Sequence, residues 1–82
     1  MRLTKVQKAL KQTGILYDYR EVLDNGEVFG QIFFRYNNKN YMVDEITGNN
    51  GRKPSGVYTN IQNRRDAWNQ TKIAEAILKK EF

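Results

Sequence analysis

Cysteine and histidine are both absent from this chain of 82 residues, and serine occurs once, as Ser55. Without cysteine, neither a disulfide nor a thiolate metal site can stabilise the fold. Without histidine, the chain lacks a common zinc ligand and the commonest general base near neutral pH, and Ser55 has no imidazole to activate it. The sequence therefore predicts a protein that is not an enzyme, that needs no metal and no cofactor, and that works by binding a partner.

Long apolar runs are also missing: nothing approaches eighteen consecutive apolar residues, and lysines interrupt the apolar positions near the N-terminus. This pattern predicts a cytoplasmic protein with no membrane partner. The length suits a single domain covering residues 1–82. Frequent asparagine, lysine and isoleucine suggest an AT-rich bacterial or phage genome.

The first structural signal is a capping-box pattern, Thr4-x-x-Gln7, which predicts a helix over residues 4–13 with Gly14 as its left-handed stop. Apolar residues then recur with helical spacing. The expected buried face consists of Val6, Ala9, Leu10 and Thr13.

The dipeptide Asn25-Gly26 predicts a type I′ turn between two antiparallel strands. A two-residue turn there sets the register on one nearly apolar face. It pairs Leu23 with Val28, Tyr19 with Ile32, Tyr17 with Phe34 and Ile15 with Tyr36. A second turn over residues 37–40 pairs Tyr36 with Tyr41 and adds a third strand.

Residues 47–56 have no helical or strand periodicity and predict a mobile basic loop. After it, Thr59-x-x-Gln62 and Asn63-x-x-Asp66 are alternative starts for a second helix that runs to about Lys80. Its expected apolar face consists of Ala67, Thr71, Ala74, Ile77 and Leu78, with Trp68 and Phe82 at the edge. The predicted fold class is α+β in the order α-β-β-β-α: a three-stranded antiparallel meander packed against two helices in two layers.

Charge is distributed unevenly within the total of +5. Residues 1–14 and 46–82 each carry a net +4, and residues 15–45 carry −3. Basic residues from the two ends would bind phosphates if the fold brings them together, whereas a row of lysines can also be an ordinary solvated surface. The candidate nucleic-acid-binding residues are Lys5, Lys8, Lys11, Arg52, Lys53, Arg64 and Arg65.

The other face of the predicted sheet is too apolar for a surface that only meets water. It places Leu16, Val22, Phe29, Phe33 and Met42 among polar and charged residues. Three explanations stay open: the first helix covers this face, a protein partner or second copy binds it, or its phenylalanines stack on bases.

The predicted function is a non-enzymatic binding protein that contacts nucleic acid through basic helices and a basic loop. The alternative is a protein–protein interaction or inhibitor module, conceivably a homodimer. Its interface residues would be Val22, Phe29, Phe33 and Met42.

Overall fold

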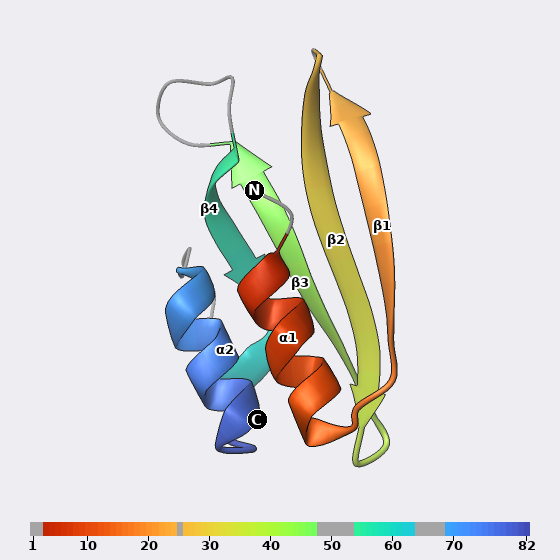
Figure 1. Ribbon diagram of the computed structural model, residues 1–82, viewed down its shortest axis with the longest axis vertical. Coiled ribbons are helices and arrows are strands. Elements are labelled where there is room, and N and C mark those ends of the chain that lie inside the picture. Colours follow the sequence, from red (N-terminus) through yellow and green to blue (C-terminus); the bar gives the residue numbers. More distant parts are fainter. Residues whose placement is uncertain (1–2, 25, 48–53, 64–68) are drawn as a thin grey trace.

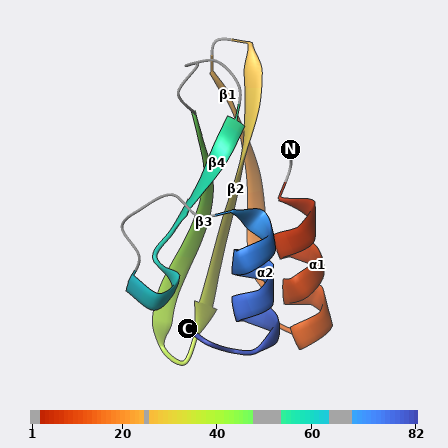
Figure 2. The ribbon, with the colours of Figure 1, turned by 90° about the vertical axis from the view of Figure 1, so that its left-hand side faces the viewer.

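The structure, a computed structural model, describes residues 3–24, 26–47, 54–63 and 69–82. Its elements are α1 (Thr4–Thr13), β1 (Tyr17–Asp24), β2 (Glu27–Tyr36), β3 (Lys39–Thr47), β4 (Pro54–Thr59), the 3₁₀ turn η1 (Ile61–Asn63) and α2 (Gln70–Leu78). The four strands form one antiparallel sheet in the order β1-β2-β3-β4. Both helices lie side by side over one face of this sheet, and no described helix covers the other (Figures 1 and 2).

The α+β class and the placement of both helices on one side agree with the sequence analysis, but the expected number of strands was wrong. The prediction had three strands, and β4 is a fourth, whose first three residues had been assigned to the basic loop. Residues 48–53 of that predicted loop lie outside the described residues. Among the β4 residues whose burial is described, 56–59, Val57 and Thr59 are buried, a pattern too short to reveal an alternation. Pro54 and Gly56, which signalled a loop, are tolerated because β4 is an edge strand.

Helix α1 has the predicted bounds, but the predicted capping box is wrong. The N-cap is Leu3, fully buried and in the left-handed region at φ 56°, and no side chain caps it. Instead, the Lys5 N–H donates to Gln70 Oε1 of α2 at 2.7 Å, so the second helix satisfies a free amide of the first. Gly14 ends α1 at φ 74°, as predicted, and its N–H points to the carbonyls of the last turn.

The first hairpin has the predicted register, with Tyr19 opposite Ile32. The paired residues begin at Tyr17 and Phe34, so the expected pair of Ile15 with Tyr36 is not part of the hairpin. The second hairpin is tighter than predicted. Asn37 and Asn38 both have positive φ, and they suffice for a two-residue turn that pairs Tyr36 with Lys39. The shift is two residues, so the side chains of β3 keep their predicted faces.

Helix α2 starts at Gln70, after both predicted starts. Its N-cap is Asn69, whose side chain accepts a hydrogen bond from the Lys72 N–H at 2.8 Å. Thr59, one expected cap, is the last residue of β4. The buried residues of α2 are Ile73, Ala74, Ala76 and Ile77.

The predicted apolar face of α2 was therefore partly wrong, because Thr71 and Leu78 are exposed. Ala67 and Trp68, also assigned to that face, lie outside the described residues. The helix ends two residues before Lys80. Beyond it, the ring of Phe82 contacts the rings of Phe34, Tyr36 and Tyr41.

The main core lies between the helices and the sheet. Its members come from both helices, from strands β2, β3 and β4, and from the neighbouring residues Leu3 and Ile61. They are Leu3, Val6, Ala9, Leu10, Ile32, Phe34, Tyr41, Val43, Val57, Ile61, Ile73, Ala74, Ala76 and Ile77. Apolar contacts therefore hold the helix layer on one face of the sheet. The outer surface of the helices and the far face of the sheet are not part of this core.

Candidate functional site

The outer surface of α1 carries three of the seven predicted nucleic-acid-binding residues. Lys5, Lys8 and Lys11 are all exposed. Lys5 Nζ also donates to Thr71 Oγ1 of α2 at 3.1 Å, which places this lysine at the junction of the two helices. Lys72, which the sequence analysis did not single out, is exposed on α2. The fold thus gathers cations of both helices in one layer.

The other four predicted residues, Arg52, Lys53, Arg64 and Arg65, lie outside the described residues. Their part in a nucleic-acid-binding surface stays a prediction.

Charge separates by layer in the described part of the chain. Segments 3–14 and 69–82, which contain the helices, carry six lysines and two glutamates, a net side-chain charge of +4. The four strands carry three cations and six carboxylates, a net charge of −3. The helix layer is therefore the basic side of the molecule, and the sheet is the acidic side.

A shallow groove of about 320 Å³ runs between α1 and α2 on their outer surface. Buried Ala9 and Ala74 form part of its lining, since small side chains let the helices approach closely. Lys5 and Lys8 lie at this groove together with Glu75. The sequence analysis missed the groove because it depends on the packing of α1 against α2, which no short motif encodes.

The far face of the sheet carries the predicted interface residues. Since both helices pack on the opposite face, the explanation that the first helix covers this one is wrong (Figure 2). Phe33 and Met42 are half-buried, and Val22 is 41% exposed. Phe29 is only 8% exposed although it is outside the main core, so it offers little area to a partner.

Two arginines of this face, Arg20 and Arg35, belong to the same part of the sheet as the half-buried Phe33. The guanidinium carbon of Arg20 is 5.5 Å from the centroid of the Phe33 ring. Arg35 donates to Asn40 Oδ1 at 3.3 Å and to the Asn38 carbonyl at 3.4 Å, which ties its side chain to the second hairpin. Tyr58 of β4, which the sequence analysis assigned to no element, lies on this face opposite Asp44.

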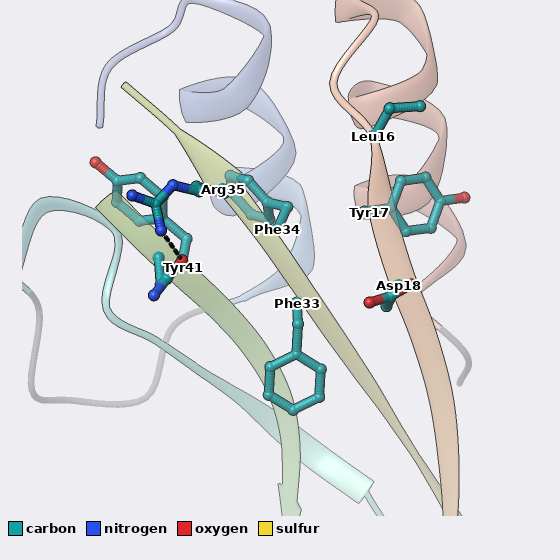
Figure 3. Close-up of a pocket in the computed structure, with 8 residues that line it drawn as sticks. Leu16, Tyr17, Asp18, Phe33, Phe34, Arg35 and Tyr41 are labelled. Carbon is teal, nitrogen blue, oxygen red and sulfur yellow. Dashed lines mark hydrogen bonds between the residues drawn. The ribbon is translucent and has the colours of Figure 1, made fainter. Parts of the chain in front are cut away.

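A shallow hollow of about 500 Å³ lies at one end of the far face (Figure 3). Its lining includes Leu16, which directly precedes β1, and Asp18 of β1. Phe33 and Arg35 of β2 line it as well. Leu16 is 91% exposed, so the hollow is open to water and has an apolar rim. Its mixed lining suits contact with a protein surface better than enclosure of a small molecule.

Glu45 is a buried carboxyl that the sequence analysis missed. It is 3% exposed on the helix side of β3, and its Oε1 accepts a hydrogen bond from the Gly30 N–H at 2.6 Å. Oε2 has no partner among the described residues. A Cβ at Gly30 would stand 3.0 Å from Oε1, which explains the glycine in mid-strand. Burial raises the pKa of Glu45, and the Gly30 hydrogen bond opposes that rise.

The carboxylates of the described residues do not assemble into a metal-binding cluster. No group of three or more such ligands comes together within the ranges that the structure describes. Asp44 and Glu45 are neighbours in sequence, but the alternation of β3 directs Asp44 to the far face and Glu45 to the core. Burial raises the pKa of Asp44, and a hydrogen bond with Gln31 lowers it.

Comparison with known proteins gives no match: no family model, no curated protein and no solved structure is significantly similar to this chain. Within the described segments, neither helix has the length and apolar character needed to cross a membrane. The functional argument therefore depends on the two surfaces described above.

Proposed function

We propose that this protein is a non-enzymatic binding domain whose helix layer contacts the phosphate backbone of a nucleic acid. Lys5, Lys8 and Lys11 on α1, with Lys72 on α2, would neutralise phosphates and release their counterions. Such contacts position a protein on nucleic acid without reading its sequence. The predicted cations at positions 52, 53, 64 and 65 would extend this surface.

The observation that carries the proposal is the separation of charge by layer. A protein with a net charge of +5 can be basic everywhere, and then charge says little about where a partner binds. Here the described helix segments carry +4 and the strands −3, so a polyanion is attracted to one side and repelled by the other. This polarity would fix the orientation in which the protein meets a phosphate backbone.

The shape of the helix layer supports a polyanion over a compact acidic ligand. The three lysines of α1 are spaced three residues apart, so they spread along the helix and partly around it. The groove that Lys5 and Lys8 flank is open and shallow, with no enclosed cavity for a small anion. A chain of regularly spaced phosphates can meet several of these cations at once.

The test is a salt series on binding to mixed-sequence duplex and single-stranded oligonucleotides, measured by fluorescence anisotropy. For duplex DNA, log K should fall linearly with log salt concentration. The double variant Lys8→Gln/Lys11→Gln should reduce the slope by about two, because each phosphate-contacting lysine contributes about one unit. Arg64→Gln/Arg65→Gln tests the undescribed part of the predicted set in the same way.

The matched control is Arg35→Gln, which removes one positive charge from the far face of the sheet. It should leave the slope within about 0.3 of the wild-type value, because a residue that touches no phosphate releases no counterions. Absence of binding in low salt, or an equal effect of Arg35→Gln and of each helix substitution, would refute the proposal.

A second function, a protein–protein interaction module, is favoured by the apolar part of the far face. Phe33, Met42 and Val22 keep exposed area there, while the mixed charges beside them disfavour phosphates. This function does not compete for the helix layer, so the two can coexist in one molecule.

A further inference from the structure

We infer that two copies of this chain associate through the far faces of their sheets, about a two-fold axis that runs parallel to β2. This inference goes beyond the proposed nucleic-acid binding and does not depend on it. The occupant of the face is a second copy, and the residues at the centre of the contact are Arg20, Phe33 and Asp44.

The first step is the apolar character of a face that no described helix covers. An antiparallel sheet with one solvated face normally alternates apolar residues inward and polar residues outward. In β2 that rule fails at Phe29 and Phe33, which share the outward face with Gln31 and Arg35. Met42 on β3 and Val22 on β1 add apolar area on either side. Phe33 lies near the middle of this surface and keeps part of its ring exposed.

The second step is one row of this face whose charges are complementary to themselves. The strand register puts Arg20, Gln31 and Asp44 in one row across β1, β2 and β3. A two-fold axis along β2 lays β1 of one copy over β3 of the other. Arg20 then faces the partner's Asp44, and Asp44 faces the partner's Arg20, while the two Gln31 side chains meet at the axis.

The neighbouring row gives the contact its apolar centre. It consists of Asp18, Phe33 and Met42, again in order across the three strands. The same axis brings Phe33 against the partner's Phe33, and ring pairs of this kind stabilise interfaces beyond the area that they bury. Apolar contact at the axis with ion pairs on both sides matches the usual arrangement of a protein interface.

Charge complementarity also selects a second copy over a nucleic acid. Base stacking on Phe33 would need a surface free of nearby carboxylates, and Asp18 and Asp44 flank this ring in the register. Against a second copy, Asp44 has the partner's Arg20 guanidinium opposite it, whereas Asp18 faces the partner's Met42. Burial raises the pKa of Asp44, and the guanidinium of Arg20 from the other copy would stabilise the charged form of this carboxyl.

The experiment is sedimentation velocity from micromolar to near-millimolar concentrations on wild type and on the charge-reversal variants Arg20→Asp and Asp44→Arg. Wild type should form dimers. Each variant alone should dissociate, with Kd raised at least about tenfold, because each reversal places like charges together twice. An equal mixture of the two variants should dimerise again, since every reversed side chain then faces an opposite charge.

Circular dichroism of each variant shows whether it folds, and the double variant Arg20→Asp/Asp44→Arg, which should be a dimer, provides a second rescue. Lys8→Gln/Lys11→Gln on the helix layer should leave the dimer intact, so a failure of nucleic-acid binding is separable from a failure of association. A wild type that is monomeric throughout, single variants that still dimerise, or a mixture that stays monomeric would each overturn the inference.

Discussion

The two faces of the sheet are built from the same strands, yet they have different roles. On the helix side, β2 presents Ile32 and Phe34 to a core that excludes water. On the far side, it presents Phe33 between Gln31 and Arg35, where the apolar ring is surrounded by groups that can pair with another molecule. The helix-side residues form the core of the fold, and the far-side residues form the surface that we propose binds a second copy.

The largest expected effect comes from truncating neighbouring residues on opposite faces. Ile32 is fully buried, so Ile32→Ala should lower the free energy of unfolding by about 3 kcal/mol. Phe33→Ala should cost about 1 kcal/mol or less in the monomer, because its ring is only half-buried. Urea denaturation at low protein concentration measures both values.

If Ile32→Ala leaves too little folded protein, Ile32→Val should cost about 1 kcal/mol and keeps the comparison measurable. A loss at Phe33 equal to that at Ile32, under conditions where the protein is monomeric, would mean that both faces form a core.

A smaller effect is expected at Glu45, the charged exception on the helix side. Glu45→Gln should raise the free energy of unfolding near neutral pH by about 1 kcal/mol, since it removes a buried charge with an unpaired oxygen. The amide oxygen can still accept the hydrogen bond from Gly30. Chemical denaturation at a series of pH values measures the change.

The pH dependence has a defined sign. Because burial raises the pKa of Glu45 in the folded state, the folded protein takes up this proton before the unfolded chain does. Stability should therefore rise as pH falls from neutral through the raised pKa towards the ordinary glutamate value, and the Gln variant should lose that part of the rise. Glu75→Gln, at an exposed position on α2, is the control and should keep the wild-type profile. Equal profiles for wild type and the Glu45 variant would contradict the prediction.

The smallest effect is expected at the rim of the far face. Leu16 is almost completely exposed, so Leu16→Ser should change the free energy of unfolding by no more than about 0.5 kcal/mol. Thermal denaturation compares it with wild type. A loss as large as that of Ile32→Ala would show that the described structure omits a contact on this side.

The sequence predicted structure well where one local signal determined it. Asn25-Gly26 set a register that agreed with the apolar alternation. The structure confirms three of the predicted pairs: Tyr17 with Phe34, Tyr19 with Ile32 and Leu23 with Val28. Prediction failed where several short signals competed. The run from Asn37 to Asn40 allowed more than one turn. The polar stretch before α2 suggested helix starts at Thr59 and Asn63, whereas the helix is capped by Asn69.

The candidate site was predictable in part for the same reason. Lysines between buried positions of an amphipathic helix must be exposed, so Lys5, Lys8 and Lys11 followed from helical periodicity. Their association with α2 depended on tertiary packing that no short motif encodes. Glu45 was within reach of sequence reasoning, because it follows Tyr41 and Val43 at alternate positions of β3 and must share their inward direction.

The contact between Lys5 and Gln70 joins residues 65 positions apart. Because α1 packs against α2 and against strands that follow it in the sequence, the first helix has no complete packing surface until residues 70–78 are available. Contacts so distant in sequence slow folding, and they link the two helices in one cooperative transition. Deletion of either helix should therefore abolish the ordered basic layer as a whole, and a ribosome-bound chain should acquire it only after α2 has emerged.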